Sequence, residues 1–522
     1  MQKITLQTFS QQSCRGVLVA ALLWPAFWGV AQPYPHYLMA GEAMTTTVLL
    51  QTRLARQERI TYSNVHDKQA LMQADLPGAP GWVRFVWKPA QGNVSVTYSP
   101  WMRAAEAHDC IVRYRVAGLA PGNRLQYALQ YGADTLQTQQ SPWQRAAIPA
   151  GDRPVKKTSL VMVTGSHLSR FYLGGGFGKP SAQGAEAYTG KDKLQGFHGF
   201  ESIARLKTDF FIGNGDNVYY DHPDDVKAIT EPQMRAMWHR QLAMPRIQKM
   251  FAGTTTYWMK DDHDHRFDDS DTLPDNPIHG SLPTHEEGRR MFAEQVPLHQ
   301  HYHPDSPTYR TIRMNPWLQI WLLEARDHRS PNAMPDGPEK SMWGKAQKEW
   351  LQQTLLASNA TFKLIVTPTP MVGPDDARKR DNHANPDGFF HEGEAFFAWL
   401  KSHKFDTERT FILTGDRHWQ YLSIHPTGYK ELSSGAMVDQ NARLGVPPGA
   451  ANSSDPRGRI VQTYSSPQAS GGFLQVLFHK KRKDWVQLAF RFRDEHGKQQ
   501  YSYTVKINTA IDKMLQSTLV AR

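Results

Sequence analysis

Short apolar runs that end in polar residues recur along the middle and the second half of the chain. These runs occupy residues 158–163, 210–212, 254–260, 318–323 and 410–413. Bounded apolar runs of this kind predict buried strands. Segments with apolar residues at helical spacing lie between them, at residues 232–242, 284–296, 344–356 and 389–400. Because strands that alternate with helices are typical of an α/β fold, we predict an α/β domain over residues 156–510.

The chain before this domain has a different pattern. Strand-like segments with partial alternation follow one another at residues 46–53, 81–87, 93–98, 110–116 and 125–131. Turn signals such as Pro89–Gly92 and Ala120–Asn123 separate them. Short strands at this spacing predict an all-β sandwich of the immunoglobulin or fibronectin type over residues 33–150, with residues 151–157 as a linker. We assign no chemistry to this domain. At the opposite end, residues 507–519 predict a weakly amphipathic helix.

Residues 1–31 have the pattern of a secretory signal peptide. Lys3 and Arg15 precede an apolar run over residues 16–31, and Gly29 and Ala31 are small residues before a cleavage point at Gln32. The pattern favours the general secretory route and a periplasmic or secreted protein without stable membrane insertion. An uncleaved anchor is the alternative. Cleavage would leave Cys110 as the one thiol, which predicts a buried structural cysteine and no disulfide within the chain.

Composition narrows the function classes. The chain has 522 residues, 40% of them hydrophobic, and a formal net charge of +11, which is typical of a globular protein with a basic surface. One basic run, Lys480–Lys483, is present, and no zinc-finger or helix-turn-helix spacing occurs. We therefore expect a solvated basic face and no nucleic-acid partner.

Acidic residues and histidines follow the predicted strands. Asp216, Asp262, Asp416, His418 and His167 each stand just after one of the apolar runs. Because parallel strands of one sheet end at one edge, we expect these side chains to meet there. The simpler interpretation of a single such Asp is a strand followed by a turn, and the repetition of the pattern favours a metal site instead.

Phosphate ester cleavage is a reaction that such a set of residues suits. Two metal ions a few Å apart neutralise the phosphoryl oxygens and make water nucleophilic. Asp216 is the natural carboxylate for both ions to share, and Asp262, Asp416 and His418 are further candidate ligands. His263, which acidic residues flank, is a candidate general acid. Sets rich in Asp also bind calcium or manganese, so the identity of the metal stays open.

Several of these segments resemble the motifs of the PhoD-like alkaline phosphatases, a branch of the metallophosphoesterases. The resemblance is carried by Gly215–Tyr219, Asp261–Asp264 and Gly415–Trp419, with further matches at residues 322–329, 343–351 and 381–389. It covers nearly the whole chain after residue 31. It implies a layered α/β sandwich as catalytic domain, phosphomonoesterase and phosphodiesterase activity, and a site with iron and calcium.

The resemblance also implies a role for single residues. Asp216 would bridge the metals, Tyr219 would bind iron, Asp262 would bind the second metal, and Asp416 and His418 would complete the site. The chain departs from the family at two positions: Ser166-His167 stands where the family has Ser-Cys, and Glu324 replaces an Asp. An imidazole at position 167 suits zinc or manganese as well as iron. Arg326 and Arg329 would clamp phosphate or serve as structural ion-pair partners.

We therefore expect a secreted metal-dependent phosphoesterase that hydrolyses phosphate monoesters, diesters or both. The diesters of a phospholipid or a cell-wall polymer are one substrate class within this expectation. The alternative is a catalytically weak protein on the same fold that binds a cell-surface polymer. His167 favours this alternative, whereas Asp216, His263, Asp416 and His418 favour the enzyme.

Overall fold

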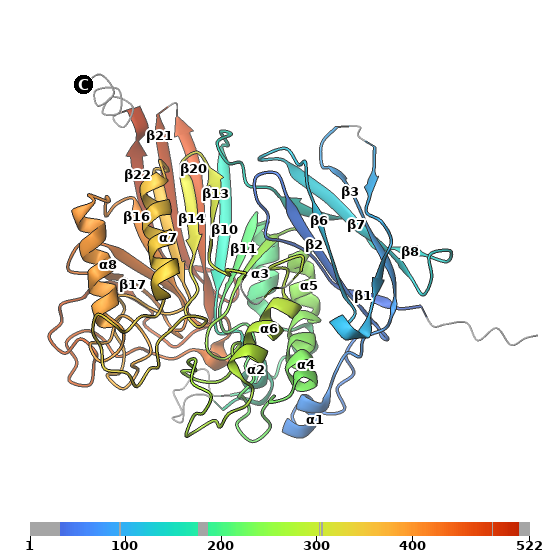
Figure 1. Cartoon of the computed structure of the whole chain (residues 1–522), viewed down its shortest axis with the longest axis horizontal. Helices are drawn as coiled ribbons and strands as arrows, with labels where there is room; N and C mark the ends of the chain where they lie inside the picture. The colour runs from blue at the N-terminus through green and yellow to red at the C-terminus, as the bar shows by residue number, and fades with distance from the viewer. Residues whose placement is uncertain are drawn as a thin grey trace, which may run out of the picture. The chain divides into compact units, whose positions relative to one another are not determined.

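Two large β-sheets form the frame of the molecule (Figure 1). The computed structural model describes residues 32–92, 95–175, 186–301, 303, 306–482 and 484–510. The predicted signal peptide, residues 1–31, lies outside the described residues. In spatial order the nine-stranded sheet consists of β22 (Gln499–Asn508), β21 (Trp485–Asp494), β20 (Gly472–Arg482), β10 (Lys157–Val163), β11 (Phe210–Asn214), β12 (Thr255–Met259), β1 (Tyr34–Gly41), β2 (Val48–Ala55) and β6 (Ile111–Val116).

The second sheet has seven strands. Its order is β13 (Arg310–Asn315), β14 (Leu318–Leu322), β15 (Phe362–Thr367), β16 (Thr410–Thr414), β18 (Lys430–Ser434), β17 (Gln420–Ile424) and β19 (Val461–Ser465). β10, β11 and β12 are parallel in the first sheet, and β14, β15 and β16 are parallel in the second. The predicted strand ends thus belong to two sheets, and the expectation of a single sheet edge was wrong.

Alternating side chains show that the two sheets face each other. Leu160 and Met162 of β10 share a core cluster with Phe411 and Leu413 of β16. Val161, between the first two, packs with the helices on the outer face of its own sheet. Successive side chains of a strand point to opposite faces of the sheet, and here both sets are buried. Apolar layers must therefore cover both faces of the sheet. The result is a mixed α/β, sheet-rich fold in which helices cover two stacked sheets.

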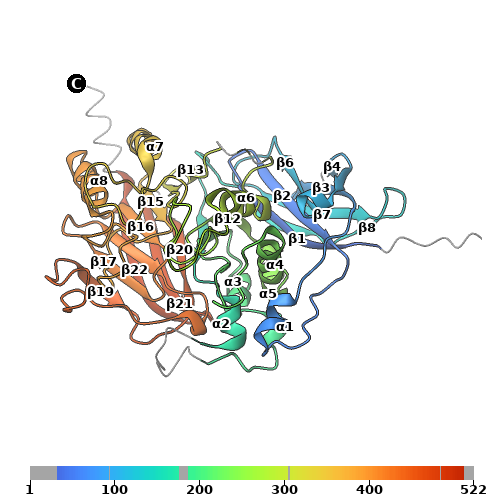
Figure 2. The same cartoon turned by 60° about the horizontal axis from the view of Figure 1, so that its bottom comes forward.

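The helices divide between the two outer faces (Figures 1 and 2). The nine-stranded sheet packs against α1 (Lys68–Gln73), α2 (Leu168–Leu173), α3 (His198–Leu206), α4 (Glu231–Leu242), α5 (Pro245–Phe251) and α6 (His285–Gln295). The seven-stranded sheet packs against α7 (Gly344–Ala357) and α8 (Phe390–Ser402). The four predicted helices correspond to α4, α6, α7 and α8, and the capping box at Thr284 and Glu287 begins α6 as predicted. Three short 3₁₀ turns, η1 (Glu106–His108), η2 (Lys193–Gln195) and η3 (Asp439–Asn441), complete the helical elements of the described residues.

The N-terminal strands belong to two different sheets. β1, β2 and β6 extend the nine-stranded sheet, because β1 pairs in parallel with β12 through Ala40 and Thr255. A separate sheet contains β4 (Thr97–Tyr98), β3 (Gly81–Pro89), β7 (Arg124–Gly132) and β8 (Gln139–Gln140), with β5 (Met102–Ala104) on β3 and β9 (Gln144–Ala147) on β7. The N-terminal segment is therefore continuous with the α/β part through one sheet, and a domain boundary near residue 150 stays a prediction.

Three smaller expectations can be compared with the structure. Cys110 is buried and carries a free thiol, as predicted. The helix predicted at residues 507–519 was wrong at its start, because β22 runs to Asn508, and residues 511–519 lie outside the described part. Among the described residues, no helix is both long enough and apolar enough to cross a membrane.

Candidate metal centre

The candidate site lies where the ends of both sheets come together. The backbone N–H of Ser166, after β10, donates to the carbonyl of Asp216, after β11, at 2.9 Å. Asn214 links the sheets, since its Nδ2 donates to the carbonyl of Thr367 at the end of β15 at 3.0 Å. A Cβ added to Gly415 would lie 2.5 Å from the carbonyl oxygen of Asn214. Glycine at position 415 therefore allows the loop after β16 to reach the loops of the other sheet.

The loop after β11 presents Asp216 in a strained conformation. Gly215 has φ +79°, and a Cβ there would lie 2.5 Å from the Cβ of Asp261. Asp216 itself has φ +53°, in the left-handed region that non-glycine residues rarely adopt and that clusters at functional sites. Its Oδ2 accepts a hydrogen bond from the Tyr219 hydroxyl at 3.0 Å. The Tyr219 oxygen in turn accepts one from Asn441 Nδ2 at 2.9 Å.

Two groups of potential ligand atoms overlap at Asp262. One group contains Asp216, Asp262 and His263, and the other contains Asp262, Asp269 and Asp381. In each group the ligand atoms lie within 4.8 Å of one another. The first group joins the loops after β11 and β12, as the sequence predicts. Two neighbouring groups with a common carboxylate are compatible with a two-metal site, in which the carboxylates would be ligands and His263 would lie beside them.

Unpartnered oxygens show that these residues fit a metal. Asp216 and Asp262 are 1% and 2% exposed. Their Oδ1 atoms are buried, and within the described part of the chain neither has a hydrogen-bond partner. Burial raises the pKa of Asp216 well above its usual value, and the charge of Asp262 raises it further. Buried carboxylates without a partner are costly, and a bound cation would offset that cost.

His263 is held by a neighbouring carboxylate. Its Nδ1 lies 2.8 Å from Oδ1 of Asp221, and both side chains are buried. Burial alone would lower the pKa of His263, but the charges of Asp221 and Asp262 more than offset it and raise the pKa well above its usual value. Despite its own burial, Asp221 has a pKa lowered to about 2 because of His263. His263 is then an imidazolium and Asp221 a carboxylate, and the Nδ1–H of His263 points to Asp221.

The loop after β16 brings Asp416 and His418 to the same place. Nε2 of His418 lies 3.7 Å from Oδ2 of Asp216. Burial lowers the pKa of His418 well below its usual value, so its ring is neutral and one nitrogen keeps a lone pair. Asp416 has φ +59°, and its Oδ2 accepts from Nη1 of Arg417 at 2.9 Å. Burial raises the pKa of Asp416 to about 6.

Comparison with known proteins indicates a phosphatase family. Residues 183–440 match the family model described as PhoD-like phosphatase. These residues form a PhoD-like phosphatase domain. The family places the enzyme among the phosphoric ester hydrolases, which confirms the enzyme class predicted from sequence. The search of curated proteins finds no match.

Two solved structures share the fold. A structure of PhoD is 14% identical, covers 91% of each chain and has a TM-score of 0.67. The structure of purple acid phosphatase PPD1 from yellow lupin (Lupinus luteus) seeds is 12% identical, with a TM-score of 0.55. That match covers 90% of this chain and 74% of the lupin protein. At such identities the similarity shows the fold alone.

His167 begins a helix. It is the N-cap of α2, and its Nδ1 accepts a hydrogen bond from the backbone N–H of Arg170 at 3.3 Å. Its ring stacks on Tyr219 with centroids 3.9 Å apart. Because Nδ1 is an acceptor, the proton of a neutral ring is on Nε2. Nε2 is buried and has no hydrogen-bond partner among the described residues. His167 thus lies beside the site, but it is in none of the four groups of potential ligands found among the described residues.

Arg326 and Arg329 are fully buried and lie behind the ligands. Nε of Arg326 donates to Asp261 Oδ1 at 2.6 Å, and its Nη2 donates to Asp381 Oδ2 at 3.0 Å. Nη2 of Arg329 donates to the carbonyl of Asp381 at 2.6 Å. The guanidinium of Arg326 is thus occupied by carboxylates, whereas Nε and Nη1 of Arg329 have no hydrogen-bond partner among the described residues. Both arginines position Asp381.

Sequence reasoning missed three acidic residues of the site and one lysine. Asp221 follows Asp216 in the same polar segment, so the sequence could have indicated it as a site residue. Asp269 and Asp381 lie in long loops and follow no predicted strand, so strand ends could not indicate them. Lys379 Nζ donates to Asp269 Oδ1 at 2.9 Å and to Asp268 Oδ1 at 3.3 Å. Lys379 thereby compensates part of the negative charge of this loop.

Proposed function

We propose that this protein is a metal-dependent phosphoesterase whose reaction centre lies between Asp216, Asp262 and His263. The observation that carries the proposal is that Asp216 and Asp262 each have one buried carboxylate oxygen that accepts no hydrogen bond from the described residues, and that an oxygen of each carboxylate lies within 4.8 Å of a ring nitrogen of His263. Buried carboxylates of a structural network are paired with cations or hydrogen-bond donors. Those of Asp216 and Asp262 instead leave ligand atoms for an ion and, through it, for a phosphate ester.

The ligands that we propose come from both sheets. Asp216, Tyr219 and His418 supply oxygen and imidazole nitrogen on one side, and Asp262 belongs to both ligand groups. The carboxylates of Asp416, Asp269 and Asp381 supply the remaining negative charge around the proposed ions. When bound, the ions neutralise the phosphoryl oxygens and lower the pKa of a water molecule. The oxygen-rich group of Asp262, Asp269 and Asp381 suits a hard cation such as calcium, whereas His418 and Tyr219 suit iron, zinc or manganese.

His263 is the group that we propose as general acid. Asp221 binds Nδ1 and keeps the ring charged, and the N–H at Nε2, which lies 3.7 Å from Oδ1 of Asp268, is the one that we propose to face a substrate. In the reaction, the Nε2 proton would pass to the leaving-group oxygen as its bond to phosphorus breaks. Asp221 then acts as a positioning residue, because it orients His263 without contacting substrate.

His167 has a different role in this proposal from the one suggested by the resemblance. Its capping bond uses Nδ1 as an acceptor and leaves a proton on Nε2, and a protonated nitrogen cannot ligate a metal. We propose that Nε2–H donates to an oxygen of the phosphate. The family's Cys-type ligand would then have no equivalent at this position, which favours divalent ions over ferric iron.

An assay with paired substrates tests the proposal. Purified protein is incubated with nitrophenyl phosphate and with bis-nitrophenyl phosphate, before and after chelation and after addition of calcium, iron, zinc or manganese. We expect hydrolysis of at least one ester, its loss on chelation and its return with metal. Hydrolysis that survives exhaustive chelation would contradict the metal dependence. A folded, metal-loaded protein inactive on both esters would favour the polymer-binding alternative.

Secretion is part of the same proposal and rests on residues 1–31. The basic start, the apolar run and the small residues before Gln32 support export and cleavage. N-terminal sequencing of the protein from its native host should begin at Gln32. A chain that retains residue 1 would contradict cleavage.

A further inference from the structure

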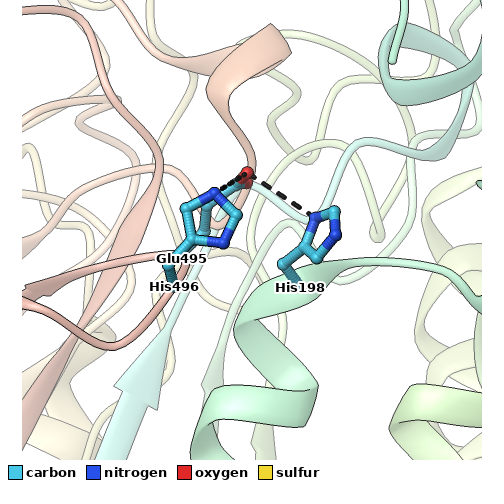
Figure 3. Close-up of side chains that lie close together, drawn as sticks. All are labelled: His198, Glu495 and His496. Atoms are coloured by element: carbon cyan, nitrogen blue, oxygen red, sulfur yellow. Dashed lines mark ion pairs between the residues drawn. The ribbon is translucent and has the colours of Figure 1, made fainter. Parts of the chain in front are cut away.

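A second cluster of ligand-type side chains lies away from Asp216, where a hairpin touches a helix (Figure 3). Glu495 and His496 are in the turn between β21 and β22, and His198 is the first residue of α3. The Ser202 hydroxyl in α3 donates to the carbonyl of Glu495 at 2.9 Å, which fixes the turn against the helix. The three side chains point toward a common centre, and the carboxylate lies between the two rings.

Distances in this cluster are those of ligands, not of hydrogen bonds. Oε1 of Glu495 lies 3.8 Å from Nδ1 of His198 and 3.7 Å from Nε2 of His496. One ligand atom of each residue lies within 4.8 Å of those of the other two. Direct hydrogen bonds between these atoms would be shorter than about 3.2 Å. Ligand atoms around a tetrahedral zinc ion, each about 2.0–2.1 Å from the metal, lie roughly 3.3 Å apart, so a small contraction would close the site.

The tautomer of His198 leaves a lone pair directed at Glu495. Its Nε2 lies 3.2 Å from Oδ2 of Asp192, and a carboxylate accepts only, so the proton is on Nε2. Nδ1 is buried and has no hydrogen-bond partner in the part of the chain that the structure describes. A lone pair and a carboxylate oxygen that face each other repel unless a proton or a metal ion lies between them, and at 3.8 Å the space suits a metal ion. A histidine bound through one nitrogen while the other donates to a carboxylate is the usual arrangement of metal-ligating histidines.

Charge around Glu495 favours the same conclusion. Glu495 is 6% exposed. Burial raises its pKa to about 8, and the charge of Asp439 contributes to the rise. A bound cation would stabilise the buried negative charge of Glu495. His496 is largely exposed, so the remaining coordination position is open to water.

We propose that His198, Glu495 and His496 bind one divalent ion of the zinc class, as a site separate from the candidate metal centre. Two imidazoles and one carboxylate form a donor set that suits zinc and its neighbours in the first transition row better than calcium or magnesium. The ion would connect the β21–β22 hairpin to α3. It would also stabilise η3, because the backbone N–H of Asp439 lies 3.4 Å from Oε2 of Glu495. The η3 turn ends at Asn441, which holds Tyr219.

Zinc content tests this site without any need for activity. Wild type and the variants His496→Ala, Glu495→Gln and His403→Ala are stripped by chelation, reloaded with zinc and dialysed, and bound zinc is measured by elemental analysis. His403 is the matched control, since it is an exposed histidine at the end of α8, far along the chain from the cluster. We expect one zinc fewer per chain in His496→Ala and in Glu495→Gln, and wild-type content in His403→Ala.

The variants distinguish a site formed by three residues from zinc that binds a single surface histidine. His496→Ala changes an exposed side chain, so the variant should fold, and a cobalt-loaded sample should lose the visible absorption of one tetrahedral ion. Equal zinc in wild type and His496→Ala would overturn the proposal. A loss in His496→Ala with none in Glu495→Gln would also overturn it, because the ion would then be bound by the imidazole alone. Hydrolysis of phosphate esters is measured in parallel and should stay within about twofold of wild type, since these residues touch neither Asp216 nor Asp262.

Discussion

Two buried clusters of charged residues in this molecule differ in how their charges are compensated. In the N-terminal part, Asp109 accepts from Arg53 Nη2 at 2.8 Å through Oδ1. Its Oδ2 lies 2.7 Å from Nε2 of His239 and accepts from Nε2 of Gln295 at 2.9 Å. At the candidate metal centre, by contrast, Oδ1 of Asp216 and Oδ1 of Asp262 accept no hydrogen bond from the described residues, and Nη2 of Arg326 stays 3.7 Å from Oδ1 of Asp262.

Opposite pKa shifts follow from this difference. Burial alone would raise the pKa of Asp109, but the hydrogen bond and charge of His239 and the charge of Arg53 hold it well below its usual range. The pKa of Asp216 is raised, because burial is reinforced by another carboxylate. The Asp109 cluster is complete within the chain and is structural. In the Asp216 cluster a bound cation would stabilise the ionised carboxylates, which is why we propose that the reaction takes place there.

The largest effect is expected for Asp216→Asn. The amide keeps the size of the side chain and removes the negative charge that would hold a metal, so hydrolysis should fall at least ~1,000-fold, the equivalent of several kcal/mol of transition-state stabilisation. Initial rates on both nitrophenyl esters measure this, with circular dichroism as the control for folding. A folded variant with a rate near wild type would remove Asp216 from the centre.

His263→Ala should have the next largest effect, and it should depend on the leaving group. A general acid matters most when the leaving oxygen is basic, so alkyl phosphates should lose ~100- to 10,000-fold and nitrophenyl esters much less. The slope of the logarithm of the rate against the pKa of the leaving group measures this dependence. Equal losses on all esters would assign His263 to metal binding or structure instead.

Stability should respond in opposite directions at the two clusters. Asp109→Asn removes the carboxylate that pairs with both Arg53 and His239 and leaves His239 with Asp75 alone, and we expect a loss of about 3–5 kcal/mol in the free energy of unfolding. In metal-free protein, Asp216→Asn removes a carboxyl group whose ionisation is disfavoured by burial and by Asp262, and it should leave that free energy unchanged or raise it. Denaturant unfolding of chelated samples measures both variants. A similar loss for both would mean that Asp216 is also part of a structural network.

Acid should unfold the protein partly through Asp109. Its folded pKa lies below its unfolded value of about 3.9, so the stability that it contributes is present above that value and is lost as the pH falls toward the folded pKa. Unfolding free energy measured between about pH 5 and pH 2 should therefore decline in wild type. The decline should be shallower in Asp109→Asn, and equal slopes would refute the assignment.

The smallest effect is expected at His167. Asn is a good N-cap, so His167→Asn should preserve the start of α2 while it removes the imidazole. If Nε2–H contacts phosphate, KM should rise a few-fold and the metal content should not change. A metal ion lost in His167→Asn would make His167 a ligand. His167→Cys would then be expected to retain more iron than wild type.

Local patterns in the sequence predicted the strands and the ligand loops, because a strand followed by Gly-Asp has a local physical cause. They could not predict which sheet a strand joins. β10, β11 and β12 separate from β14 and β16 through pairings between residues far apart in the sequence, and β1 joins β12 in the same way. Asp269 and Asp381 were missed for a similar reason, since Arg326 and Lys379 place them through contacts between loops. The capping role of His167 required knowledge that α2 begins beside Tyr219.

Metal content tests the central claim most directly, because it does not depend on the choice of substrate. Wild type and Asp216→Asn are purified in parallel, reloaded with a mixture of calcium, iron, zinc and manganese, dialysed and measured by elemental analysis. The account predicts at least one metal ion per chain fewer in Asp216→Asn, with both proteins folded. The same metal content in the two proteins would contradict the assignment of Asp216 to a metal centre.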